Sequence, residues 1–96
     1  MYVIYGKVQI LIPHAASLKD KRQIINSIIS RIKNRFNISI SEIEFQDLWQ
    51  RSCLGFAAIS NSAADTELIL QTIRKTLDYY DYEIEVSDLD WELIKD

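Results

Sequence analysis

Three cations lie close together in a short segment where a helix is predicted to begin, Ser17–Arg22. Ser17 is a favourable N-cap, and Asp20 follows three residues later, as in a capping box. The N-terminal end of a helix already carries partial positive charge, so each added cation costs roughly 0.3–1 kcal/mol unless an anion offsets it. Asp20 is one such anion, and an external phosphate is another. The candidate phosphate-binding cations are Lys19, Lys21 and Arg22.

Further cations continue along the same predicted helix, which spans Leu18–Phe36 on the evidence of apolar residues at helical spacing. Arg22 and Lys33 flank one side of the apolar stripe, whereas Arg31 and Arg35 flank the other. Lys33 and Arg35 therefore extend the candidate nucleic-acid surface toward the end of the helix. The competing interpretation is that these cations pair with acidic residues of the same molecule.

A second candidate contact is the segment Gln46–Arg51, which is predicted to connect two strands as a hairpin. Trp49 could stack on a base or a partner beside Arg51. It could equally fold back over the edge of the sheet as a local apolar cap. Both interpretations of Trp49 stay open, and the candidate nucleic-acid-binding set therefore comprises Lys19, Lys21, Arg22, Lys33, Arg35, Trp49 and Arg51.

The residue types needed for catalysis or metal binding are scarce. His14 is the only histidine and Cys53 the only cysteine, whereas a transition-metal site normally needs three or four such ligands. The loop Pro13–Ser17 also lacks the arginine and glycines on which an acylphosphatase of similar size depends. We therefore expect no enzyme activity, no metal and no cofactor, although a small-molecule site remains a distant alternative.

The order of the predicted elements is β-α-β-β-α-β, which is the ferredoxin-like α+β arrangement. Strands show a period of two and helices a period near 3.6. A one-residue bulge near Ser41 and Glu42 is expected to turn both Ile43 and Phe45 inward, and Trp91 is expected in the core. We predict two helices on one face of a four-stranded antiparallel sheet. The predicted strands and second helix cover Tyr2–Ile12, Ile38–Phe45, Ser52–Ile59, a helix from Ser62 to near Tyr80, and Tyr82–Trp91.

Length and charge set further limits. The 96 residues form one domain, and the net charge is −3. This average conceals a split, since residues 1–51 hold eight cations and four acids, whereas residues 52–96 hold three cations and ten acids. No apolar run is long enough to span a bilayer and no signal peptide is recognisable, so we expect a cytoplasmic protein without membrane contact. The single cysteine agrees with that compartment.

The sheet face that the helices leave open is the second predicted surface. Its centre is apolar with small side chains, which favours a protein interface, most simply a homodimer. An RNA-binding mode on this face, as in RRM domains, is disfavoured because the third strand lacks an aromatic residue and flanking glutamates would repel phosphates. The residues expected at the dimer interface are Val3, Tyr5, Leu11, Cys53 and Ala57.

Four segments together resemble the bacterial YlxP-like family, which is classified as domain of unknown function 503. They are Ser17–Arg22, Asn34–Ser39, Gln46–Arg51 and the closing Asp90-Trp91. The resemblance extends over almost the whole chain, with Asp20 where the family has Glu and His14 where it usually has a small residue. It implies a ferredoxin-like fold and brings no catalytic residues.

The genes of this family tend to lie beside genes for translation initiation and ribosome maturation. The resemblance therefore implies a role linked to the ribosome or to RNA. We expect a non-enzymatic accessory factor that binds ribosomal subunits or structured RNA through the basic start of the first helix. The alternative is a homodimerisation module that makes no nucleic-acid contact.

Overall fold

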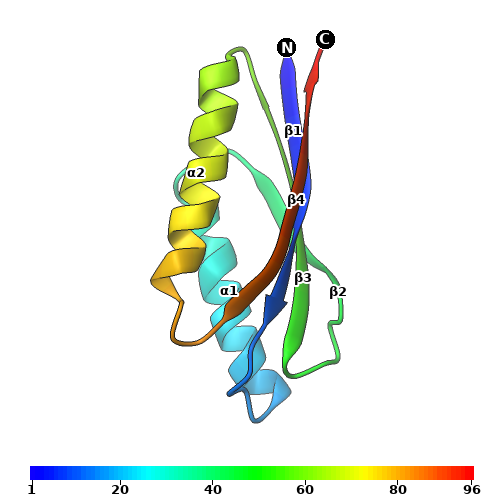
Figure 1. Cartoon of the computed structure of the whole chain (residues 1–96), viewed down its shortest axis with the longest axis vertical. Coiled ribbons are helices and arrows are strands. Elements are labelled where there is room, and N and C mark those ends of the chain that lie inside the picture. The colour runs from blue at the N-terminus through cyan, green and yellow to red at the C-terminus, as the bar shows by residue number, and fades with distance from the viewer.

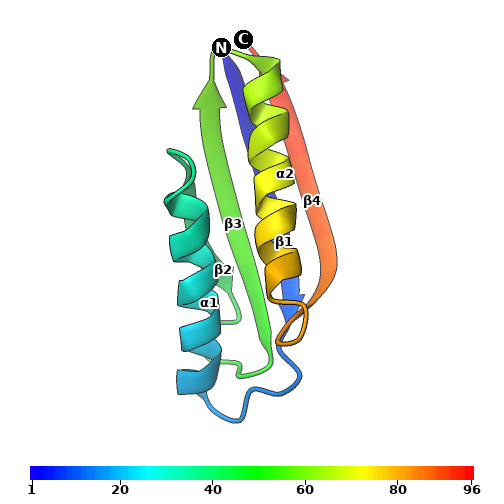
Figure 2. The same cartoon turned by 90° about the vertical axis from the view of Figure 1, so that its left-hand side faces the viewer.

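The computed structural model describes all 96 residues and has the predicted order of elements (Figure 1). The four strands form one antiparallel sheet in the order β2-β3-β1-β4. Both helices cover the same face of this sheet and lie side by side, as Figure 2 shows. The ferredoxin-like prediction is confirmed. The elements are β1 (Tyr2–Leu11), α1 (Leu18–Lys33), β2 (Ser39–Glu44), β3 (Arg51–Ser60), α2 (Ala63–Tyr79) and β4 (Glu85–Lys95).

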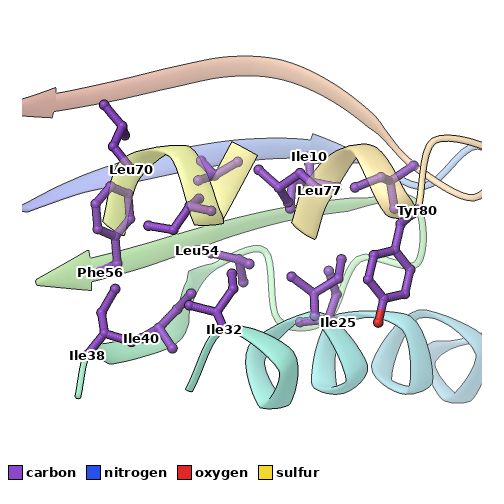
Figure 3. Packing of buried hydrophobic residues seen from close by; sticks show 14 of the residues in the cluster. Ile10, Ile25, Ile32, Ile38, Ile40, Leu54, Phe56, Leu70, Leu77 and Tyr80 are labelled. Atoms are coloured by element: carbon purple, nitrogen blue, oxygen red, sulfur yellow. The ribbon is translucent and has the colours of Figure 1, made fainter. Parts of the chain in front are cut away.

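The core lies between the sheet and the helix layer. Alternate residues of β1 and β3 meet in register, for example Val8 with Leu54 and Gly6 with Phe56. The helices bring their apolar stripes onto this surface, because residues three or four positions apart share one side of a helix. Figure 3 shows these side chains interdigitating. The fully buried members include Ile4, Val8, Ile10, Ile12, Ile28, Ile32, Leu54 and Ile73.

The bulge in β2 is present, but its predicted consequence is wrong. The register against β3 shifts between Glu42 and Glu44, which makes Ile43 the extra residue. Ile43 lies on the open face, over Gly55, rather than in the core. Glu42 turns toward the helices instead, because its carboxylate pairs there with Lys21 of α1. Phe45 adopts a positive φ of 66° just after the strand and is only half-buried.

The last strand also differs from the prediction. It begins at Glu85 rather than at Tyr82, whose side chain is exposed in the preceding turn. Trp91 is 40% exposed, so its placement in the core was wrong. The reason is the placement of the helices, which pack mainly on β1, β2 and β3, whereas β4 lies at the edge of the sheet with little helix contact.

Candidate nucleic-acid interface

Lys21 lies inside the protein and is not available to an external phosphate. Its side chain is 0% exposed, and its Nζ lies 2.9 Å from Glu42 Oε2. It also donates hydrogen bonds to the backbone oxygens of Phe45 and Gln46, at 2.5 and 3.5 Å. Ser52 Oγ donates to the same Glu42 oxygen at 2.5 Å. The prediction that Lys21 binds nucleic acid is therefore wrong.

The position of Lys21 along α1 explains its burial. It precedes Ile25 by four residues and Ile28 by seven, so it falls on the buried stripe of the helix. A buried ammonium group is tolerated only where hydrogen-bond acceptors and an opposite charge surround it. β2 and the loop that follows it provide both. The segment Ser17–Arg22 thus divides into one structural cation and two exposed cations.

The predicted helix cap forms as expected. Ser17 Oγ accepts a hydrogen bond from the Asp20 backbone N–H at 3.1 Å, and Asp20 Oδ2 accepts one from the Ala16 N–H at 3.1 Å. Lys19 and Arg22 remain exposed beside this cap. The Lys21–Glu42 pair is the one salt bridge in the molecule, so the other cations of α1 have no acidic partner. Pairing within the molecule therefore accounts for Lys21 alone.

Three of the exposed cations form a line along the side of α1. Lys33 follows Arg22 by eleven residues, which is close to three full turns at about 3.6 residues per turn. Lys19 lies about one turn before Arg22 and is rotated from it by about 60°, toward the outward side of the helix. We call Lys19, Arg22 and Lys33 the outer line.

A second group of cations lines a groove between the two helices. Arg31 and Arg35 reach it from α1 and the segment that follows, and Lys75 reaches it from α2. The groove has a volume of about 500 Å³ and no carboxylate in its lining. The guanidinium of Arg31 lies 4.1 Å from the ring centroid of Tyr79, a cation–π contact that holds it in place. The remaining lining residues are Asn34, Leu68, Thr72, Thr76 and Tyr79.

The sequence pointed to only part of this groove. Arg31 and Arg35 were placed on the same side of the first helix, and Arg35 was a candidate residue. The sequence did not identify Lys75, because the periodic pattern of a helix does not reveal which of its faces lies beside another helix. The available signal was that Lys75 follows Leu68 by seven residues, which places both on one side of α2. This spacing does not indicate that α1 lies beside that side.

The hairpin loop between β2 and β3 presents Trp49 to solvent, with 52% of the side chain exposed. The loop is fixed against the start of α1, because Gln50 Nε2 donates to the backbone oxygens of Pro13 and Ala15, both at 3.2 Å. Arg51 lies over the ring of Phe45, 4.0 Å from its centroid. Trp49 is thus an exposed side chain on a braced loop at the same end of the molecule as Lys19.

The open sheet face has a different character. Tyr5, Lys7 and Gly55 line a shallow hollow of about 420 Å³ at its centre. Acidic side chains of β4, the strand paired with β1, lie along one edge of this face. These acids are Glu85, Asp88, Asp90 and Glu92.

Two ionisable groups of the open face have shifted pKa values. The Tyr5 hydroxyl donates to Glu92 Oε2 at 2.8 Å, and this bond, with the negative charge of Glu92, raises the pKa of Tyr5 above 10.0. Burial, with a smaller effect of Glu44, raises the pKa of the Cys53 thiol. Cys53 is fully buried beneath this face, so its expected place in a dimer interface was wrong. Val3 and Leu11 are half-buried here, whereas Tyr5 and Ala57 are exposed.

Nothing in the structure gathers metal ligands. His14 lies beside Asp20 and Glu83 near the start of α1, but no group of three or more His, Cys, Asp or Glu side chains is placed to hold a metal ion. Neither helix is long and apolar enough to cross a membrane.

Comparison with known proteins identifies relatives over almost the whole chain. Residues 3–91 match the family described as "Protein of unknown function (DUF503)". The uncharacterized protein YlxP of Bacillus subtilis (strain 168) is 39% identical over 88 residues, which cover 91% of this chain and 96% of that protein.

Solved structures share the fold at low sequence identity. The designed protein Foldit4 has a TM-score of 0.60 at 10% identity, covering 100% of this chain and 99% of that chain. A Deinococcus radiodurans protein provisionally described as an antibiotic biosynthesis monooxygenase has a TM-score of 0.59 at 15% identity, covering 100% and 92%. The designed ferredoxin-fold protein LFR1 1 has a TM-score of 0.53 at 12% identity, covering 98% and 84%. At these identities the likeness concerns the fold alone.

Proposed function

The chain belongs to the DUF503 family, whose function is unknown, and we propose that it is a non-enzymatic accessory factor that binds structured RNA or ribosomal subunits through its helix layer. The observation that carries this proposal is the outer line of α1. Lys19, Arg22 and Lys33 are exposed and have no acidic partner within the molecule.

Unpaired cations on one surface are an electrostatic site for a polyanion. Each phosphate that a Lys or Arg neutralises releases condensed counterions, which favours binding and makes it sensitive to salt. The exposed Trp49 at the adjacent end of the molecule adds an aromatic surface on which an unpaired base could stack. The acidic side chains of β4 lie on the opposite face of the sheet, so they do not stand between the outer line and its ligand.

The test is a filter-binding titration of the full chain against purified small ribosomal subunits and against a folded ribosomal RNA fragment, at two salt concentrations. We expect salt-sensitive binding, and we expect the variant K19A/R22A/K33A to lose at least tenfold in affinity with a shallower salt dependence. Arg74→Ala is the matched control, because Arg74 is exposed on α2 and lies outside the groove. Binding that does not respond to salt, or that the triple variant retains in full, would contradict the proposal.

A second candidate function is homodimerisation through the open sheet face. The specific observation is a set of exposed apolar side chains on that face, among which Ile59 is 68% exposed. Tyr5, Ile43 and Ala57 lie around the central hollow, and soluble monomers rarely leave large apolar patches uncovered. A stable dimer would need to bury about 1,000 Å² or more in total.

Sedimentation equilibrium decides this second candidate. We expect a dimer at high micromolar concentration and a monomer for Ala57→Glu, which places a charge in the centre of the face. Arg74→Glu is the control, because Arg74 is exposed on α2 and lies outside the open face. A wild-type chain that sediments as a monomer at high micromolar concentration excludes the dimer.

A further inference from the structure

We infer that the groove between α1 and α2 is a second phosphate-binding site, and that α1 lies between the two phosphate strands of an RNA duplex. This inference rests on the proposed function and adds the class of RNA. It is carried by three features of the helix layer: the groove, its position relative to the outer line, and the side chains that lie between the two.

The groove has the composition of an anion site. Arg31, Arg35 and Lys75 line it together without any carboxylate, so their mutual repulsion has no internal offset. Arg31 is held against the ring of Tyr79, which limits the freedom that its guanidinium would lose on binding. Thr72 and Thr76 line the same groove, and a threonine hydroxyl can donate a hydrogen bond to a phosphate oxygen.

The groove and the outer line are on opposite sides of α1. Arg31 follows Arg22 by nine residues, which is about two and a half turns of helix. The two groups of cations are therefore separated by roughly the width of a helix, about 10–12 Å with side chains. A single strand offers one line of phosphates, whereas a duplex groove is bordered by two.

Apart from Lys19 at the start of the helix, the side chains between these two lines are polar and uncharged. Gln23, Asn26 and Ser30 are all exposed, and their spacing of three and four residues places them on one outward stripe of α1. Amide and hydroxyl groups suit the minor groove of A-form RNA, which is wide, shallow and lined by 2′-hydroxyls. This stripe thus fits the floor of the groove while the flanking cations meet its walls.

The experiment measures binding of the full chain to an RNA duplex of about 16 base pairs, a length that includes two successive minor grooves. The same sequence as single-stranded RNA and as a DNA duplex provides the comparison. Three variants probe the groove (R31A/R35A/K75A), the outer line (K19A/R22A/K33A) and the polar stripe (Q23A/N26A/S30A). Arg74→Ala is again the control. The variant R31K/R35K keeps the positive charge of the groove but changes the contact between Arg31 and Tyr79, so it separates the effect of charge from that of local structure.

We expect the RNA duplex to bind at least tenfold more tightly than the single strand. The slope of log K against log salt is negative, and each cation variant should make it shallower by about 2–3. This follows because each phosphate contact contributes about −0.9 to the slope. The polar-stripe variant should reduce the preference for RNA over DNA and leave the slope unchanged. R31K/R35K should keep the wild-type slope.

Several results would overturn the inference while the proposed function stands. These are equal affinity for single strand and duplex, a groove variant that binds the RNA duplex as the wild type does, or a polar-stripe variant that keeps the full preference for RNA over DNA. Absence of salt-sensitive binding to every RNA would instead remove the proposed function, and the inference with it.

Discussion

The helix layer and the open sheet face lie on opposite sides of the same sheet, and α1 in the first differs in charge from β4 at the edge of the second. The exposed charges of α1 are mainly cationic and unpaired, whereas β4 carries acidic side chains along its open side. Part of the split between a basic first half and an acidic second half of the sequence thus becomes a difference between α1 and the open side of β4. A chain with a net charge of −3 can therefore present a basic surface, and its net charge alone does not exclude a polyanionic partner.

The two faces also differ in how the polar groups beneath them are satisfied. Under the helix layer, Lys21 has the carboxylate of Glu42 and two backbone carbonyls as partners. Under the sheet face, Gln9 Oε1 is buried without a hydrogen-bond partner. The helix side thus contains a closed polar network, and four substitutions test how the two sides of the sheet differ.

The largest expected effect is that of Lys21→Met. Removing the ammonium leaves Glu42 and two carbonyl groups without their partner, and breaking a buried pair in this way costs about 3–5 kcal/mol of unfolding free energy. Urea unfolding measures the change. Lys19→Met is the matched control, because Lys19 is exposed and its loss should change stability by no more than about 0.5 kcal/mol. Equal stability of the two variants would show that the network does not anchor the helix layer.

A smaller effect is expected from a methyl group added on each side of the sheet. In Gly6→Ala the new Cβ would lie 2.3 Å from the Asp90 backbone oxygen, so the β1–β4 pairing must shift, at a cost of about 1–3 kcal/mol. In Gly55→Ala the nearest atom is Ile43 Cδ1 at 3.0 Å, which is the end of a flexible side chain on the open face.

We therefore expect Gly55→Ala to cost less than about 1 kcal/mol, or to stabilise the strand. Thermal unfolding of both variants measures the difference. A larger loss of stability for Gly55→Ala than for Gly6→Ala would contradict our expectation that the open face tolerates an added methyl group better than the helix-covered face.

The smallest effect concerns the acidic edge of the open face. Glu92→Gln removes the charge that raises the pKa of Tyr5, so this pKa should fall toward 10.0. Because the pKa of Tyr5 is higher in the folded chain than in the unfolded chain, its contribution to stability is present below pH 10 and is lost as the pH rises through the folded-state pKa. A pH titration of the Tyr5 ring resonances by NMR measures the shift. Arg74→Ala is the control, and an unchanged Tyr5 pKa in Glu92→Gln would exclude the charge of Glu92 as a cause, because the Gln amide oxygen can still accept the hydrogen bond.

The fold could be predicted because its periodic patterns are local. Alternation along β1 and spacing of three and four along α1 identify the buried side of each element, and one arrangement buries all of these sides together. The prediction failed where an interaction between distant residues overrides the pattern. Ile43 lies outside the core because Glu42 turns inward to reach Lys21, and Trp91 is partly exposed because the helices pack mainly on the three strands other than β4.

The sequence by itself determined the order of elements, the cap at Ser17 and the presence of a basic first helix, since each depends on residues close together in the chain. Tertiary structure decided which of those cations are exposed. Lys21 differs from Lys19 and Arg22 only in the side of α1 on which it lies and in the carboxylate that β2 provides there. It also decided that Lys75 joins Arg31 and Arg35, because the neighbour of a helix face is set by packing between elements and not by the helix itself.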